Sequence, residues 1–252
     1  MGQKRFLFLG DSITELGVGE RGWIRYFNEI VNPAFFVNIA VSGARLSNSG
    51  ADVEFNGNPV FLGDNTDYDQ NVLSNQIEKI ARAKDKTNRH YCHNADFDDF
   101  DCIVIAAGTN DFFCKEKCNI ETIENQFTRN GKVLPQSDIN CADWAGAMRY
   151  IYEKLREFYP NAAIFFCAPV QASEEKRPYT SILYKRNLMA AICDRISDVT
   201  FVDTFKCGIC GIYEKAGENG RDLIDGLHPN ISGAKKIGRY NAAAVLKRLS
   251  EL

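Results

Sequence analysis

Residues suited to serine hydrolysis lie in two short stretches near opposite ends of the 252-residue sequence. Gly10-Asp11-Ser12 follows the first apolar run, where a sharp turn would expose the serine hydroxyl at the tip of a strand. Asp225-Gly226-Leu227-His228 supplies a histidine with a carboxylate three residues before it. Such hydrolysis needs a nucleophile, a base that takes its proton and an acid that orients the base. Ser12, Asp225 and His228 are therefore candidate catalytic residues.

The elements that must position these residues are visible as hydrophobic patterns. Five short apolar runs, rich in β-branched or aromatic residues, predict buried parallel strands. They are Arg5–Leu9, Phe35–Ile39, Cys102–Ala106, Ala163–Cys167 and Thr200–Val202. Segments 144–158, 182–196 and 234–249 carry apolar residues at helical spacing. The alternation predicts an α/β protein in which helices cover both faces of an open parallel sheet.

Several chemically suggestive positions follow the predicted strands. Ser12 follows the first strand, Gly43 the second and Asn110 the third, while Asp225 and His228 follow the fifth. In an open parallel sheet the carboxyl ends of the strands face one edge, where ligands bind. We therefore expect these distant residues to converge into one site.

The same positions carry a resemblance to a known family. The matching blocks are Gly10-Asp11-Ser12-Ile13, Gly43, Gly108-Thr109-Asn110-Asp111 and Asp225-Gly226-Leu227-His228-Pro229. In this order, each after a strand, they resemble the blocks of GDSL-type, or SGNH, hydrolases, which are esterases and lipases. The resemblance implies a three-layer αβα fold with a flavodoxin-like, five-stranded parallel sheet, in one domain over residues 1–252. It also implies cleavage of carboxylic esters through an acyl-enzyme on Ser12, with no metal and no organic cofactor.

The family resemblance further assigns a role to each block. Ser12 would be the nucleophile and His228 the general base, with Asp225 holding the imidazole in the right tautomer. The oxyanion hole would combine the backbone N–H groups of Ser12 and Gly43 with the side-chain amide of Asn110. Glycine permits close backbone approach to a substrate, and an amide donates a hydrogen bond without carrying charge.

Four further residues are predicted to contact the substrate: Asp11, Arg45, Phe112 and Phe113. After the glycine of the second block many relatives carry a small polar or acidic residue, whereas Ala44-Arg45 follows Gly43 in this chain. Arg45 either reaches the cleft and favours a negatively charged substrate group or points to solvent, and we favour solvent. Phe112 and Phe113 either line an acyl pocket or pack beneath the following loop.

A second interpretation is a noncatalytic, flavodoxin-like module that binds a phosphate or a dinucleotide. Gly17-Val18-Gly19-Glu20-Arg21-Gly22 forms a G-x-G-x-x-G pattern. That pattern is meaningful only when it leaves a strand directly and opens a helix, and here Gly10-Asp11-Ser12 occupies that place. A serine at a helix N-terminus can also cradle an anion. Neither alternative explains Asp225 together with His228, so hydrolysis is favoured.

The cysteines indicate the redox environment. Nine is an odd number, and Cys102, Cys167 and Cys193 lie in apolar runs, where a reduced thiol behaves as a small hydrophobe. This pattern favours a reducing compartment over a disulfide framework. Four other cysteines could together form a zinc site with four thiolate ligands, although unlinked thiols are favoured. These are Cys114, Cys118, Cys207 and Cys210.

Net charge and the lengths of the apolar segments indicate which partners and which cellular location to expect. The net charge of -3 gives no reason to expect nucleic acid as a partner. The apolar stretches are too short to span a bilayer, and the one after Lys4-Arg5 is too short for a signal peptide. A cytoplasmic location is therefore predicted, unless a leader has been trimmed.

Segments of about 47–70 and 114–141 are predicted to be long loop insertions. Carbohydrate O-acetyl, lysophospholipid and small acyl esters all stay open as substrates, as does the oligomeric state.

Overall fold

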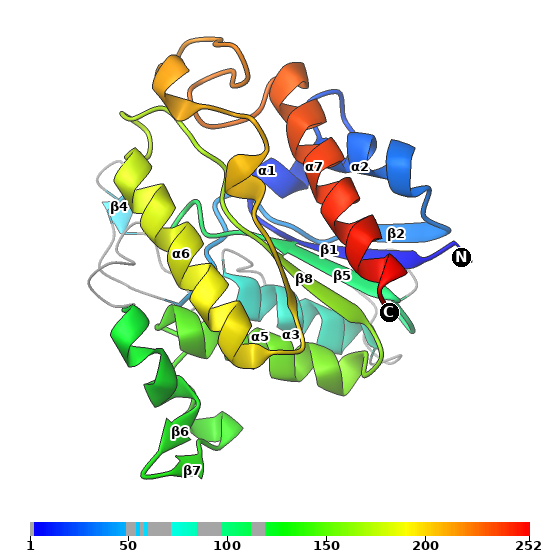
Figure 1. Cartoon of the computed structure of the whole chain (residues 1–252), viewed down its shortest axis with the longest axis vertical. Helices are drawn as coiled ribbons and strands as arrows, with labels where there is room; N and C mark the ends of the chain where they lie inside the picture. Colours follow the sequence, from blue (N-terminus) through cyan, green and yellow to red (C-terminus); the bar gives the residue numbers. More distant parts are fainter. Residues whose placement is uncertain (1–2, 49–53, 56–57, 60–71, 85–96, 112–118) are drawn as a thin grey trace.

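A computed structural model describes residues 3–48, 54–55, 58–59, 72–84, 97–111 and 119–252. Its centre is a sheet of five parallel strands in the order β2-β1-β5-β8-β9 (Figure 1). The strands are β1 (Arg5–Gly10), β2 (Phe35–Asn38), β5 (Cys102–Ala106), β8 (Ala163–Cys167) and β9 (Thr200–Val202). All five predicted strands are confirmed, with bounds that differ by at most one residue.

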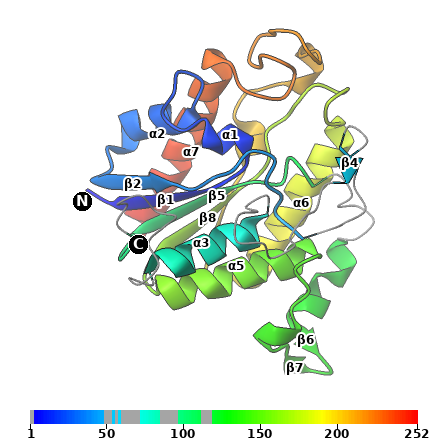
Figure 2. The same ribbon diagram turned by 180° about the vertical axis from the view of Figure 1, so that it is seen from behind.

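Helices cover both faces of this sheet, which confirms the predicted three-layer αβα fold (Figures 1 and 2). On one face lie α2 (Trp23–Val31) and α7 (Ile231–Ser250). On the other face lie α3 (Leu73–Lys84), α5 (Trp144–Phe158) and α6 (Tyr179–Ile196). None of the helices in the described ranges is long and apolar enough to cross a membrane.

The packing of strand β1 explains its apolar run from Phe6 to Leu9. Phe6 and Phe8 point to one face, where both rings pack edge-on against Phe27 of α2. Leu7 and Leu9 point to the other face and join the core beneath α3 and α5. Because both faces are covered, a strand of this sheet has no solvent side and needs no polar alternation.

Helices α2 and α3 are not among the predicted elements, although their sequences carry the signal. Trp23 and Phe27 of α2, like Leu73, Ile77 and Ile80 of α3, are buried at helical spacing. Both segments thus carry the apolar spacing that is typical of an amphipathic helix.

The remaining elements are short. They are α1 (Ser12–Glu15), the two-stranded pairs β3 (Glu54–Phe55) with β4 (Asn58–Pro59) and β6 (Thr128–Arg129) with β7 (Lys132–Val133), and 3₁₀ helices over Ile120–Gln126, Gln136–Asp138, Thr204–Lys206 and Gly211–Tyr213. Both strand pairs fall in the predicted loop insertions, so the described parts of those segments contain secondary structure of their own. Phe112, Phe113, Cys114 and Cys118 lie outside the described residues.

Candidate active site

The candidate nucleophile stands where the strand order reverses. That reversal lies between β1 and β5, and ligands of open parallel sheets bind beyond the strand ends at such a point. Ser12 follows β1 as the first residue of α1, and Asn110 follows β5. The turn between β1 and α1 approaches β5 closely, since a Cβ on Gly10 would lie 2.2 Å from the carbonyl oxygen of Ala106. Only glycine fits there.

Three sequence-predicted residues meet in one hydrogen-bonded relay. Ser12 Oγ lies 2.9 Å from His228 Nε2, and His228 Nδ1 lies 2.8 Å from Asp225 Oδ2. The other carboxylate oxygen, Asp225 Oδ1, accepts the backbone N–H groups of Leu227 at 2.9 Å and His228 at 2.7 Å. The acid therefore holds both the ring and the backbone of the histidine.

These hydrogen bonds also set the charge of the acid. Burial alone would raise the pKa of Asp225, but the hydrogen bonds from the His228 ring and from the two backbone groups outweigh it. The pKa of Asp225 consequently lies below its usual value. Asp225 is a carboxylate at neutral pH, which is the form that orients an imidazole and stabilises it when protonated.

The turn that carries the relay requires its glycine. Gly226 has φ +81°, in the left-handed region that side chains disfavour. A Cβ there would also lie 2.6 Å from Ser173 Oγ and 2.7 Å from the carbonyl oxygen of Lys215. The turn ends before α7, whose N-terminus is capped by Asn230 through a hydrogen bond from the N–H of Gly233.

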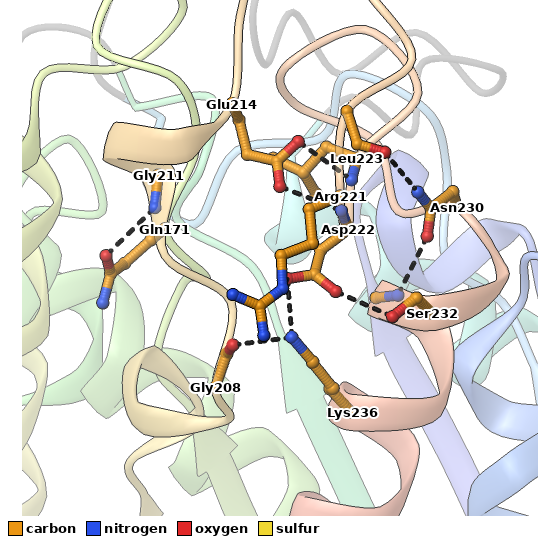
Figure 3. Close-up of polar contacts among 12 residues, drawn as sticks. Gln171, Gly208, Gly211, Glu214, Arg221, Asp222, Leu223, Asn230, Ser232 and Lys236 are labelled. Carbon is orange, nitrogen blue, oxygen red and sulfur yellow. Dashed lines mark hydrogen bonds and ion pairs between the residues drawn. The ribbon is translucent and has the colours of Figure 1, made fainter.

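A buried carboxylate network, missed in the sequence, anchors the segment just before this turn to α7 (Figure 3). Glu214 is buried and accepts the backbone N–H groups of Asp222 at 2.9 Å and Leu223 at 3.3 Å. The Asp222 carboxylate in turn accepts Ser232 Oγ at 2.8 Å and Lys236 Nζ at 2.6 Å. No short-range sequence pattern predicts these contacts, because each of them joins an acid in a polar loop to a group 8 to 14 residues away.

The three predicted oxyanion donors lie on adjoining segments. The backbone N–H groups of Ser12 and Gly43 donate to no acceptor within the described part of the chain. Asn110 Nδ2 donates to the carbonyl oxygen of Ala44 at 3.1 Å, which places the amide beside the glycine segment. Gly43 has φ +76°, and a Cβ there would meet nothing within 4 Å. Backbone conformation, and not crowding within the protein, requires this glycine.

Asp111 ties the segment after Gly43 to the segment of Asn110. Its carboxylate accepts the N–H groups of Leu46 at 2.9 Å and Ser47 at 3.0 Å, the Ser47 hydroxyl at 2.8 Å and Trp144 Nε1 at 3.0 Å. Asp111 is fully buried, so removing its carboxylate would break four hydrogen bonds in the interior of the protein. The loop after Gly43 is thereby fixed to the residue that follows Asn110.

The prediction that Arg45 points to solvent is wrong. Arg45 is only 2% exposed. Burial lowers its pKa, and attraction to the Asp111 carboxylate partly offsets that effect. A buried negative charge next to the loop thus draws the guanidinium inward, where the sequence alone suggested an exposed cation.

Asp11 is buried as well, at 2% exposure. Its carboxylate accepts the N–H of Ile13 at 3.0 Å and so caps the N-terminus of α1, which carries Ser12. Burial raises the pKa of Asp11 to about 7, against the hydrogen bond from Ile13 and the attraction of His228, which lower it. The structure thus assigns Asp11 a capping role; the predicted contact with substrate stays a prediction.

Replacing Asp11 with asparagine is expected to change how stability depends on pH. Between the unfolded value near 3.8 and the folded value of about 7, the native state holds a proton that the unfolded chain releases. The contribution of Asp11 to the free energy of unfolding of the parent protein therefore falls as pH rises through this window. Asparagine can still cap the helix, but it does not titrate and makes no such contribution.

Urea unfolding at pH 5.0, 5.5, 6.0 and 6.5 measures this difference. The Asp11→Asn free energy of unfolding, minus that of the parent, should rise by about 1.4 kcal/mol per pH unit. Parallel pH curves for the two proteins would show that Asp11 does not titrate in this range.

Two alternative sites predicted from sequence gain no support. Strand β1 leads directly into α1, and Gly17-Val18-Gly19-Glu20-Arg21-Gly22 lies beyond it, ending as the cap of α2. A Cβ on Gly22 would lie 2.0 Å from the carbonyl oxygen of Gly17, so close backbone packing requires glycine at position 22. Cys207 and Cys210 are free thiols, and their predicted zinc partners fall outside the described residues.

The three cysteines predicted to lie in the core are buried there. Cys102, Cys167 and Cys193 are free thiols with at most 3% exposure. Burial raises the pKa of Cys102 and of Cys167 to about 12. These thiols are therefore unreactive packing groups.

Comparisons with known proteins agree with this geometry. The family model described as "GDSL-like Lipase/Acylhydrolase family" matches residues 8–236. A possible lipase from Chitinophaga pinensis DSM 2588 shares the fold with TM-score 0.60 and 17% identity, over 98% of this chain and 99% of that one. Est24, a carbohydrate acetylesterase from Sinorhizobium meliloti, gives TM-score 0.56 and 16% identity over 97% and 99%.

A family two carbohydrate esterase from Clostridium thermocellum, solved with cellohexaose, gives TM-score 0.55 and 18% identity, over 99% of this chain and 65% of that one. Curated protein sequences gave no match to this chain. The solved structures establish the fold, and the family model covers nearly the whole sequence. The chain therefore belongs to the GDSL-like lipase/acylhydrolase family and is an ester-hydrolysing enzyme.

Proposed function

We propose that this enzyme is a serine esterase that cleaves carboxylic esters through an acyl-enzyme on Ser12. The observation that carries the proposal is the unbroken relay from Ser12 Oγ to His228 Nε2 at 2.9 Å and from His228 Nδ1 to Asp225 Oδ2 at 2.8 Å. A serine hydroxyl is a weak nucleophile unless an adjacent base takes its proton, and the relay supplies that base already oriented.

In the proposed mechanism, Ser12 Oγ attacks the ester carbonyl carbon while His228 Nε2 accepts the hydroxyl proton. The negative charge that forms on the carbonyl oxygen is held by the N–H groups of Ser12 and Gly43 and by Asn110 Nδ2. His228 returns the proton to the departing alcohol, which leaves an acyl group on Ser12. A water molecule, deprotonated by His228, then releases the acid and restores the hydroxyl.

O-Acetylated carbohydrate is the substrate class that we propose first. It is supported by the carbohydrate esterases from Sinorhizobium meliloti and Clostridium thermocellum among the proteins of this fold. The discriminating measurement is a series of p-nitrophenyl esters from acetyl to octanoyl, with acetylated cello-oligosaccharide and lysophosphatidylcholine beside it. Preference for acetyl over longer chains, with acetate released from the sugar, supports this class. Preference for octanoyl with turnover of the lysolipid contradicts it.

We also propose a cytoplasmic location for the protein. The support comes from its thiols: Cys102, Cys167 and Cys193 are buried and unpaired, and the other cysteines in the described ranges are also unpaired. Free thiols of this kind suit a reducing compartment.

Labelling with a fluorophosphonate tests the proposed nucleophile. The reagent phosphonylates activated serine hydroxyls, so intact mass should show one adduct, and peptide mapping should place it on Ser12. A protein that neither forms the adduct nor hydrolyses short p-nitrophenyl esters would contradict the proposal.

Replacing Asn110 with alanine is expected to lower kcat by about 10²–10³-fold, because one of the three donors to the developing oxyanion is lost. KM should change much less, since the donor acts mainly on the transition state. Steady-state kinetics on p-nitrophenyl acetate measure both values. An unchanged kcat would show that Asn110 is not part of the oxyanion hole.

A further inference from the structure

A turn after β8, formed by residues 173–177, contacts both halves of the candidate site. At its start, the N–H of Ser173 donates to the carbonyl oxygen of Gly226 at 2.7 Å, within the turn that carries His228. At its end, Arg177 reaches the segment that carries Asn110. The turn is closed on itself, because the N–H of Arg177 donates to the Ser173 carbonyl oxygen at 2.9 Å.

The Arg177 guanidinium determines which way the Asn110 amide faces. Arg177 Nε donates to the Thr109 carbonyl oxygen at 2.8 Å, and Nη2 donates to Asn110 Oδ1 at 3.3 Å. The amide nitrogen of Asn110 meanwhile donates to the Ala44 carbonyl oxygen at 3.1 Å. Flipping the amide would set its NH₂ group against a cationic donor and its oxygen against a carbonyl oxygen. Only the observed orientation satisfies both neighbours.

The charge of Arg177 adds to this geometric effect. A hydrogen bond from an ionised donor is stronger than a neutral one, and it polarises the amide that accepts it. Electron density drawn toward Asn110 Oδ1 makes the hydrogens on Nδ2 better donors. Burial lowers the pKa of Arg177, and the attraction between its guanidinium and Asp11 opposes that effect. A guanidinium keeps its proton in proteins, so this charge is fixed.

We propose that Arg177 is a positioning residue for the oxyanion hole, which locks the Asn110 amide with Nδ2 toward the developing oxyanion and strengthens that donor. The inference rests on the proposed function, because it requires that negative charge form beside Asn110. In this role Arg177 acts through Asn110 and not on a reacting atom.

Steady-state kinetics of Arg177→Met on p-nitrophenyl acetate test the proposal. We expect kcat to fall about 10- to 100-fold, the range of one hydrogen bond to a charged group, while KM changes less than about threefold. Inhibition by an alkylboronic acid, which forms a tetrahedral adduct on serine, should weaken by a similar factor. Arg177→Lys should lie between parent and Arg177→Met, because it keeps the charge and loses the two-point donor.

A double-mutant cycle with Asn110→Ala separates positioning from a general structural effect. Without the amide, Arg177→Met should cost less than about twofold in kcat. The matched control is Arg156→Met at the opposite edge of the sheet, where the guanidinium also donates to backbone carbonyl oxygens, those of Pro160, Ala162 and Asp198. Its kcat should equal that of the parent.

Two results would overturn the inference while leaving the esterase proposal intact. One is a kcat within twofold of the parent for folded Arg177→Met and Arg177→Lys. The other is an equal loss with and without Asn110. Failure of the parent protein to form a fluorophosphonate adduct on Ser12 would instead contradict the proposed function itself. Circular dichroism and Tm identify any variant that does not fold, in which case Arg177→Gln replaces it in the cycle.

Discussion

Replacing Ser12 with alanine is expected to lower kcat for p-nitrophenyl acetate by about 10⁴-fold or more and to abolish the fluorophosphonate adduct. The side chain supplies the attacking atom, and no other hydroxyl is hydrogen-bonded to a histidine in the described part of the chain. The backbone N–H of residue 12 is retained in this variant. Any residual rate then reports the oxyanion donors and binding without the nucleophile.

Replacing His228 with alanine should cost about as much, and the double variant should be no slower than either single one. The reason is that Ser12 Oγ and His228 Nε2, 2.9 Å apart, act as one unit: the hydroxyl is a poor nucleophile without the base, and the base has no proton to take without the hydroxyl. Ser137→Ala, an exposed serine in a 3₁₀ helix, is the matched control and should keep the parent kcat. Losses that multiply in the double variant would contradict a shared relay.

The sequence predicted those parts of the molecule that local patterns determine. The central strands β1, β5 and β8 are buried on both faces, so each forms a continuous apolar run that is visible in the sequence. The relay could be predicted because Ser12 and His228 each follow an element that ends at the same sheet edge. Parallel topology, and not sequence proximity, then brings the two residues together.

The parts that were missed depend on contacts without local spacing. Arg177 meets Asn110 across 67 positions, and an arginine in a polar loop is ordinarily a surface residue. Arg45 was expected in solvent for the same reason, and its burial follows from a charge on Asp111 that no pattern near residue 45 reveals. The burial of such charged residues can be predicted only when the fold is known, because the fold brings the interacting group next to them.

Replacing Asp225 with asparagine is expected to lower kcat by about 10³- to 10⁴-fold while leaving the backbone of the turn in place. The structure indicates why so small a change costs so much. Oδ1 accepts the N–H groups of Leu227 and His228, so the carbonyl oxygen of asparagine must stay there. The NH₂ group is then forced toward His228 Nδ1, in the place of Oδ2.

An amide donor facing Nδ1 favours the tautomer of His228 that is protonated at Nε2. In that tautomer Nε2 donates to Ser12 Oγ and cannot accept its proton, so attack and fluorophosphonate labelling should slow together while KM changes little. Rotating the amide would not rescue the variant, because the NH₂ group would then oppose two backbone donors. Exposed Asp138→Asn, which should keep the parent kcat, controls for the change of charge. If Asp225→Asn kept kcat within tenfold of the parent, His228 would be oriented by the fold alone, and Asp225 would be a residue of the turn and not of the reaction.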